Sequence, residues 1–204
     1  MLKAMGIAGS PRADGNSTAL LRAALAGAEH AGATTDVAIL NDLTYRGCQA
    51  CRPCTPDATC RIPDGLTDVF AALRAADVWV LAAPIYFDGV SGQMKAFYDR
   101  LYHLVNDRGE LAKQLAGPRA GGIIVTYEDK ERDDYRDVAG RLANYLGWMG
   151  DFDPVEVLSI GGLGPAGAAA GRADLLARAE ALGRSLVQRL ARRRASDGPG
   201  RSDA

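Results

Sequence analysis

Short apolar runs, several of them rich in valine and isoleucine, alternate along this chain with longer amphipathic stretches. The apolar runs predict five strands, at Leu2–Ala8, Thr35–Leu40, Asp77–Ala83, Ala120–Thr126 and Val155–Ile160. The amphipathic stretches predict five helices, at Asn16–Ala31, Leu66–Ala75, Gly92–Val105, Asp133–Leu146 and Ala173–Arg194. Strands and helices that alternate in this way are typical of a parallel sheet covered by helices. The predicted fold class is therefore α/β.

Five strand–helix units are the number found in a flavodoxin-like fold, a doubly wound five-stranded parallel sheet with helices on both faces. At 204 residues, of which 48% are hydrophobic, the chain is long enough for one domain with a sizeable core. We expect a single flavodoxin-like domain over residues 1–194, with a cysteine-containing loop at 45–65. Residues 195–204 lack apolar anchors, so we expect a disordered tail there.

The charge of the chain is almost balanced, with 24 basic and 25 acidic residues and a formal net charge of −1. This balance gives no overall field that would attract nucleic acid or a membrane surface. The apolar start is too short for a signal peptide, and no run approaches the ~20 apolar residues that cross a bilayer. Because clustered thiols also suit a reducing compartment, we expect a cytoplasmic protein without nucleic-acid or membrane partners.

A polar segment with two glycines, residues 9–18, joins the first predicted strand to the first predicted helix. The start of a helix presents unpaired backbone N–H groups and a partial positive charge, so it favours a phosphate. Three hydroxyls and a guanidinium could bind that phosphate, from Ser10, Ser17, Thr18 and Arg12. The segment lacks the Gly-Lys-Ser/Thr of an ATP-binding loop, which argues against nucleoside triphosphate hydrolysis. The alternative is a helix start whose polar residues only cap the helix.

The four cysteines of the chain lie within thirteen residues, at Cys48, Cys51, Cys54 and Cys60. Thiols separated by two residues can surround one centre if the backbone wraps around it, as in loops that bind an iron–sulfur cluster. Zinc sites usually combine two pairs of cysteines separated by a longer loop, so this spacing favours iron–sulfur over zinc. Free or redox-active thiols are the alternative.

Three motifs in order carry a family resemblance. Gly-Ser-Pro-Arg-x-x-Gly-Asn-Ser-Thr at 9–18 resembles the FMN phosphate loop of the NADPH-dependent FMN reductase family, and 84–100 is similar to that family's second signature. With the cysteine loop between these two motifs, the chain resembles the iron–sulfur flavoprotein branch of the family. The resemblance covers about the first hundred residues, and the remainder agrees only in its strand–helix rhythm.

The resemblance implies an FMN site at the ends of three strands. The phosphate would be held by residues of the first loop, which are Ser10, Arg12, Asn16, Ser17 and Thr18. The isoalloxazine ring would lie against residues that follow the third and fourth strands, which are Pro84, Ile85, Tyr86, Phe87, Gly89 and Thr126. Cys48, Cys51, Cys54 and Cys60 would ligate a [4Fe–4S] cluster, an electron relay beside the flavin. The flavin carries the chemistry, so no catalytic acid–base side chain is implied.

By the same resemblance, the protein would be an FMN-dependent oxidoreductase. It would take electrons from NAD(P)H and pass them to a quinone-, nitro- or iron–sulfur-type acceptor. One alternative is a non-enzymatic electron carrier with both centres, fed by ferredoxin, and another is a metal or redox sensor based on the cysteine loop alone. A homodimer or homotetramer is expected, and the aromatic-rich helix Gln93–Val105 could form its interface or belong to the core.

Two positions depart from the family pattern. Relatives tend to carry paired aspartates after the fourth cysteine, whereas this chain supplies only Asp64. Relatives also often have a glycine-rich turn after the fourth strand, where this chain has Glu128 and Asp129. Carboxylates at that place would disfavour an anionic reduced flavin unless they point to solvent.

Three further features are interpreted as structural. Gly162–Gly167 matches the dinucleotide-binding pattern Gly-x-Gly-x-x-Gly, but no second strand follows to complete the unit, so we interpret it as a glycine-rich loop. The chain's two histidines lie on predicted helices away from the motifs. We expect His30 at the surface and His103 in packing or at an interface.

Overall fold

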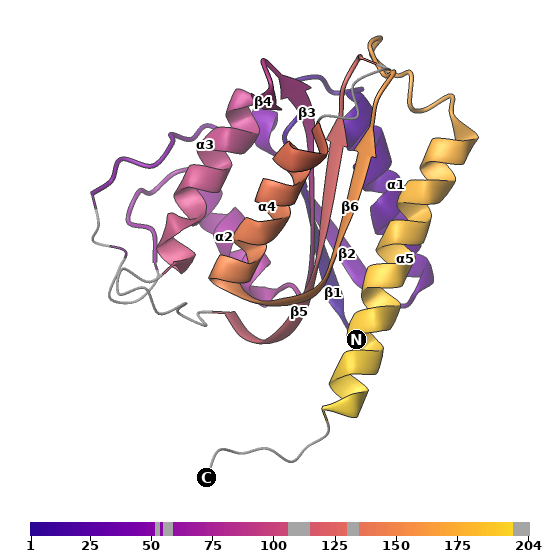
Figure 1. Ribbon diagram of the computed structural model, residues 1–204. Helices are drawn as coiled ribbons and strands as arrows, with labels where there is room; N and C mark the ends of the chain where they lie inside the picture. Colours follow the sequence, from indigo (N-terminus) through magenta and orange to yellow (C-terminus); the bar gives the residue numbers. More distant parts are fainter. Residues whose placement is uncertain (52–53, 55–58, 106–114, 130–134, 198–204) are drawn as a thin grey trace.

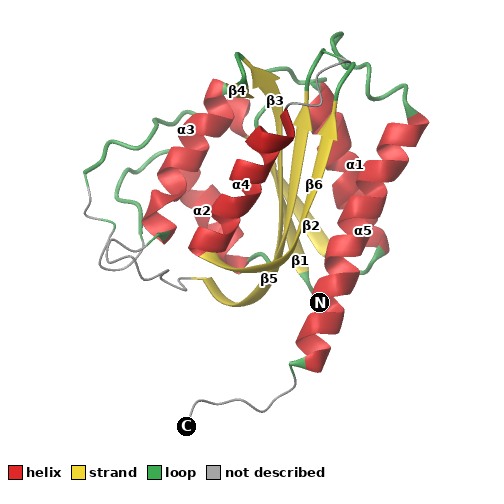
Figure 2. Cartoon of the chain, in the orientation of Figure 1, coloured by secondary structure: helices red, strands yellow, loops and turns green. Residues whose placement is uncertain are grey.

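The computed structural model describes residues 1–51, 54, 59–105, 115–129 and 135–197. Figures 1 and 2 show one twisted sheet with helices on both of its faces. Five parallel strands lie in the order β2-β1-β3-β5-β6. They are β1 (Lys3–Ala8), β2 (Thr34–Ile39), β3 (Val78–Tyr86), β5 (Leu115–Thr126) and β6 (Gly150–Ile160). The predicted flavodoxin-like fold is confirmed.

The helices divide into two layers. One face of the sheet is covered by α1 (Asn16–His30) and α5 (Ala173–Ser196), and the other by α2 (Leu66–Ala75), α3 (Gly92–Arg100) and α4 (Arg136–Met149) (Figure 1). The described residues also form the 3₁₀ turns η1 (Leu40–Asp42) and η2 (Leu101–Leu104). No helix in the described part of the chain is long and apolar enough to span a membrane.

The central strand β3 shows why the sheet is buried on both sides. Val78, Val80 and Ala82 point into the core under α1 and α5. Trp79 and Leu81 point into the core under the other three helices, because successive side chains of a strand alternate between faces. An apolar run with no polar alternation is the sequence pattern of a strand of this kind.

Helices α1 and α5 approach each other backbone to backbone. A Cβ atom at Gly27 would collide with the carbonyl of Glu180, and one at Gly183 would collide with the carbonyl of Ala24. Two glycines therefore allow the close contact that closes this layer over the sheet.

The elements differ from the predicted ones mainly at their ends. β5 and β6 begin earlier than predicted and pair from Leu115 and Gly150 onward. The two-residue strand β4 (Gly89–Val90), which pairs antiparallel with β3, was not predicted. The helix predicted at Gly92–Val105 becomes η2 after Arg100.

The prediction of a disordered tail from residue 195 is wrong at its start, because α5 continues to Ser196. Residues 198–204 lie outside the described residues, as do residues 133 and 134 at the start of the predicted fourth helix. Within the described chain that helix, α4, begins at Arg136 and ends at Met149.

Candidate functional site

Three loops meet at the carboxyl ends of β1, β3 and β5. The Gly9 N–H donates to the Ala82 carbonyl at 2.8 Å, and the Ser91 hydroxyl donates to the Gly9 carbonyl at 2.6 Å. Pro84 on β3 lies opposite Thr126 on β5 in the sheet register. In doubly wound folds this edge of the sheet is where ligands bind.

Two hydroxyls in the first turn of α1 are buried without a partner. Ser17 is 1% exposed and Thr18 is 3% exposed, and neither side-chain oxygen has a hydrogen-bond partner among the described residues. A buried hydroxyl left unpaired costs about 1–3 kcal/mol, so such groups are rare unless a ligand completes them. Their place at a helix N-terminus, next to free backbone N–H groups, suits a phosphate.

The loop before α1 folds tightly over this helix start. The Arg12 N–H donates to the Ser10 hydroxyl oxygen at 3.1 Å, and the Gly15 N–H donates to the Arg12 carbonyl at 3.1 Å. A Cβ at Gly15 would collide with the Ser10 hydroxyl, so only glycine fits there. Ser10 is buried and the side chain of Arg12 is exposed. The structure therefore brings Ser10, Ser17 and Thr18 together, with Arg12 at the rim.

Asn16 has a different role from the one implied by resemblance. Its amide nitrogen donates to the carbonyls of Leu163 at 2.8 Å and Pro165 at 2.9 Å, and its oxygen accepts from the Ala169 N–H at 2.9 Å. The side chain is thus committed to the loop between β6 and α5, and only its backbone N–H remains for a phosphate. Sequence reasoning missed this contact, because nothing in the local sequence links the two segments.

The second loop is a tight hairpin between β3 and β4. Tyr86 pairs with Gly89, and the two residues between them, Phe87 and Asp88, have φ values of 47° and 59°. These left-handed values belong to a type I′ turn, which normally uses glycine or asparagine rather than phenylalanine. Tyr86 is partly exposed and Phe87 fully exposed. The Tyr135 hydroxyl donates to the Asp88 carboxylate at 2.8 Å and ties the turn to the start of α4.

The third loop follows Thr126, which is buried at the end of β5. The Tyr127 N–H donates to the Ile160 carbonyl at 3.1 Å, and the Leu163 N–H donates to the Tyr127 carbonyl at 3.0 Å. The loop therefore packs on the glycine-rich segment 162–167, which lies in the connection between β6 and α5. Glu128 and Asp129 are both exposed, so water screens their charges.

A hollow of about 380 Å³ beside α3 is lined by all four cysteines. None of them forms a disulfide, and Cys54 is buried while Cys48 and Cys51 are exposed. Burial raises the pKa of the Cys54 thiol, and the other three thiols add to that rise against a backbone hydrogen bond that lowers it. Among the described residues, no three histidine, cysteine or acidic side chains are close enough together to hold a metal ion. The donor set is chemically suited to an iron–sulfur cluster, although the thiols are not gathered around one point.

Arg100 lies in the wall of this cysteine hollow and is 1% exposed. It forms an ion pair with Asp64, with 2.7 Å between Nη1 and Oδ2. Burial opposes the charge of Arg100, but hydrogen bonds to Asp64 and Cys60 outweigh it and raise the pKa of the guanidinium. For Asp64 too, burial alone would raise the pKa, and the hydrogen bond from Arg100 turns the net shift downward. Both groups are therefore charged at neutral pH.

His103 is buried in the same wall. Its Nδ1 donates to the Arg100 carbonyl at 2.6 Å, and its ring lies 4.5 Å from that of Phe70. Burial, together with the charges of Arg74 and Arg100, lowers the pKa of His103 to about 4. His103 is thus a neutral packing residue, as expected, while His30 lies exposed beside Glu180.

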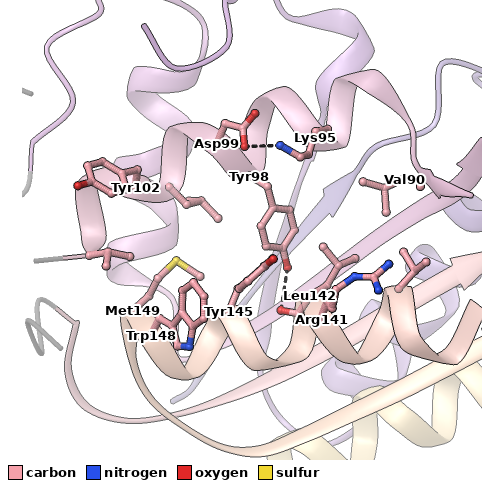
Figure 3. Close-up of a pocket in the computed structure, with 14 residues that line it drawn as sticks. Val90, Lys95, Tyr98, Asp99, Tyr102, Arg141, Leu142, Tyr145, Trp148 and Met149 are labelled. Carbon is pink, nitrogen blue, oxygen red and sulfur yellow. Dashed lines mark hydrogen bonds and ion pairs between the residues drawn. The ribbon is translucent and has the colours of Figure 1, made fainter. Parts of the chain in front are cut away.

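A second hollow, of about 360 Å³, separates α3 from α4 and is mainly apolar (Figure 3). Phe97 and Tyr98 of the predicted aromatic helix are core residues, whereas Tyr102 is exposed at 38%. On α4, Trp148 is exposed at 52% and its ring lies 4.7 Å from that of Tyr145. The hollow shares Tyr102 with the cysteine hollow and reaches Gly89 of the hairpin.

Solved structures share the fold at low sequence identity. A NAD(P)H:quinone oxidoreductase from Methanothermobacter marburgensis superposes with a TM-score of 0.70 at 18% identity, over 91% of this chain and 96% of that one. An FMN-dependent NADH-azoreductase from Bacillus anthracis, solved in complex with FMN, superposes with a TM-score of 0.61 at 15% identity, over 94% of this chain and 100% of that one.

Relatives at higher identity match a shorter stretch. An iron–sulfur flavoprotein of Methanocaldococcus jannaschii is 37% identical over 124 residues, which are 61% of this chain and 62% of that protein. An iron–sulfur flavoprotein of Methanosarcina thermophila is 32% identical over 133 residues, 62% and 70% of the two chains. The chain thus matches less than two thirds of the length of the first relative. The model of the NADPH-dependent FMN reductase family matches residues 2–131, well over half of the sequence, and the chain belongs to that family.

Proposed function

We propose that this protein is an FMN-dependent oxidoreductase that takes electrons from NAD(P)H and passes them to a quinone-, nitro- or iron–sulfur-type acceptor. The observation that carries the proposal is the pair of buried, unpartnered hydroxyls of Ser17 and Thr18 at the carboxyl edge of the sheet. Membership of the FMN reductase family supports it independently.

The residues of the three loops would bind and orient FMN. Ser10, Ser17 and Thr18 would donate hydroxyl hydrogen bonds to the phosphate, the first turn of α1 would add backbone N–H groups, and Arg12 would cover it from the rim. The Pro84–Gly89 hairpin and Thr126 would border the ring. When bound, FMN would supply the redox chemistry, so the protein's part is positioning and electrostatics.

We further propose that Cys48, Cys51, Cys54 and Cys60 hold a [4Fe–4S] cluster that relays electrons to or from the flavin. The shared hollow of the four thiols supports this, as do the names of the two relatives, both iron–sulfur flavoproteins. A redox sensor without flavin is less suited, because it would leave the two buried hydroxyls without a ligand. Four unpaired cysteines also favour a reducing compartment, the cytoplasm.

A second candidate is a non-enzymatic carrier that exchanges electrons with ferredoxin. The exposure of Cys48 and Cys51 favours it, since a centre near the surface can exchange electrons with a protein partner. Assembly into a homodimer or homotetramer is also proposed, through the aromatic surface of Tyr102 and Trp148. Sedimentation of the wild-type chain and a Trp148→Ser variant tests that assembly.

The deciding experiment combines composition with turnover. Anaerobically purified protein should contain FMN and about four irons per chain, with flavin bands on a broad iron–sulfur absorption. Cys51→Ser should lose the iron and keep the FMN, and the same variant with full iron content would refute the ligand assignment. The loaded protein should oxidise NADPH or NADH with an artificial acceptor. A protein that contains both FMN and iron but does not oxidise NADPH or NADH would be a non-enzymatic electron carrier.

A further inference from the structure

Arg100 is almost completely buried, and each of its five N–H donors has an acceptor. Nη1 donates to the Arg46 carbonyl at 2.8 Å and to Asp64 Oδ2 at 2.7 Å. Nη2 donates to the Ile62 carbonyl at 3.2 Å and to Asp64 Oδ1 at 3.2 Å. Nε donates to Cys60 Sγ at 3.2 Å. An arginine carries five N–H groups, so each has an acceptor and the plane of the guanidinium is fixed.

Asp64 holds this guanidinium from the other side. Its carboxylate binds Arg100 in a bidentate manner and also accepts from the backbone N–H groups of Arg46 at 3.2 Å and Leu66 at 3.1 Å. Bidentate pairs of this kind fix orientation as well as charge. Arg46 precedes the first cysteine and Asp64 follows the last, so α3 closes the cysteine loop at its base through one side chain.

Arg100 could hold the two ends of the cysteine loop together without its bond to sulfur. The carbonyls and Asp64 already occupy four of the donors, and the remaining Nε–H points at Cys60, one of the four thiols of the hollow. A thiol is a weak acceptor, whereas a thiolate or a metal-bound sulfur is a better one. Asp64 already pairs the charge of Arg100, so the Nε–H bond is not needed to offset the burial of that charge and is directed at the Cys60 sulfur.

We propose that Arg100 is a positioning residue for the iron–sulfur centre, which holds the Cys60 sulfur in place and raises the centre's reduction potential. The inference rests on the proposed function, in which Cys60 is a cluster ligand. Hydrogen bonds to the sulfurs and nearby positive charge stabilise the more negative, reduced state of a cluster. Asp64 opposes that charge, so the pair together sets the potential.

The test is a redox titration of the full-length, anaerobically reconstituted protein, followed by electron paramagnetic resonance. Arg100→Gln removes the charge and the Nε donor, and its cluster should have a lower midpoint potential than the wild type. Arg100→Lys keeps the positive charge but lacks the five N–H donors of the guanidinium. Its cluster should have a midpoint potential between those of the wild type and Arg100→Gln. Asp64→Asn removes the opposing charge at nearly constant size and should shift the potential upward.

Two references separate this effect from a general loss of structure. The FMN midpoint potential, read from the visible spectrum of the same sample, should change less than that of the cluster. Arg119→Gln is the matched control, because Arg119 is also buried but donates to the carbonyls of Arg74 and Ala76 at the end of α2. That variant should leave the cluster potential unchanged.

The outcomes separate the inference from the proposed function. A wild-type protein that takes up no iron would overturn the cluster and, with it, this role of Arg100. Iron-loaded Arg100→Gln and Asp64→Asn with the wild-type potential would overturn only the inference. Should Arg100→Gln fail to retain iron, Asp64→Asn decides, because it keeps the arginine and still predicts an upward shift.

Discussion

The side-chain amide of Asn16 donates a 2.8 Å hydrogen bond to the carbonyl of Leu163, which lies 147 residues later in the chain. With its bonds to Pro165 and Ala169, this one side chain joins the first turn of α1 to the loop that precedes α5. The Gly167 N–H adds a bond of 3.1 Å to the Asp14 carbonyl. The end of the loop at residues 9–18 is therefore held by the loop between β6 and α5.

Asn16→Ala should consequently destabilise the FMN-free protein and weaken FMN binding together. It leaves three backbone groups without their partner, two of them in buried hydrogen bonds, so we expect a loss of about 2–4 kcal/mol in the free energy of unfolding. Urea denaturation measures the first effect and quenching of FMN fluorescence the second. Asn144→Ala, which removes an exposed asparagine of α4, is the control and should change neither quantity.

Thr18→Val should separate stability from binding. The hydroxyl of Thr18 is buried without a partner, so replacing it by a methyl group of similar shape should leave the stability of FMN-free protein unchanged or raise it by about 1 kcal/mol. FMN affinity should fall about tenfold, because the phosphate loses a donor and tenfold is about 1.4 kcal/mol. Thr67→Val alters an exposed threonine of α2 and serves as the control. Unchanged FMN affinity in Thr18→Val would show that this hydroxyl does not face the phosphate.

Local patterns predicted the middle of each element better than its ends. The bounds of α2 agree with the prediction, because a continuous apolar spacing runs from Leu66 to Ala75. The start of β6 was missed, since Gly150, Asp151 and Pro154 are typical of a turn. The strand forms there because Gly150 and Phe152 pair with the equally unpredicted start of β5, a contact that only the assembled sheet supplies.

In the candidate site too, the features contained in one segment could be predicted from the sequence, whereas contacts between distant segments could not. The cysteine spacing and the polar loop at residues 9–18 are each contained in one short segment, so a site can be predicted there from the sequence alone. The bond from Arg100 to Cys60 joins residues 40 apart, and the one from Asn16 to Leu163 joins residues 147 apart. Neither an asparagine nor an arginine indicates from the local sequence which distant residue it will contact. For that reason the sequence predicted a phosphate contact for Asn16 and no role for Arg100.

The burial of His103 predicts a specific dependence of stability on pH. Its pKa of about 4 in the folded protein lies below the ordinary value of 6.5, so the unfolded chain binds the proton first. The contribution to stability is complete above pH 6.5 and is lost as the pH falls to 4, by up to about 3 kcal/mol. His103→Gln should remove this part of the dependence, measured by urea denaturation of cluster-free protein from pH 7 to pH 4.

His30→Gln is the matched control, because it removes the chain's other histidine, which is exposed on α1. Carboxylates that titrate between pH 7 and pH 4 change the stability of the wild type and of both variants by the same amount. The difference between the wild type and His103→Gln should therefore decrease as the pH falls. A constant difference across the interval would contradict a neutral, buried His103.

Phe87 occupies a left-handed backbone conformation with a fully exposed side chain, so its ring stabilises nothing in the FMN-free protein. Phe87→Gly and Phe87→Ala both remove the ring, but only glycine adopts φ = 47° without strain. Phe87→Gly should therefore be more stable than Phe87→Ala by about 1 kcal/mol in urea denaturation. If the ring borders the flavin, both variants should bind FMN more weakly by a similar factor. Full FMN affinity in both would leave the strained phenylalanine without a part in flavin binding.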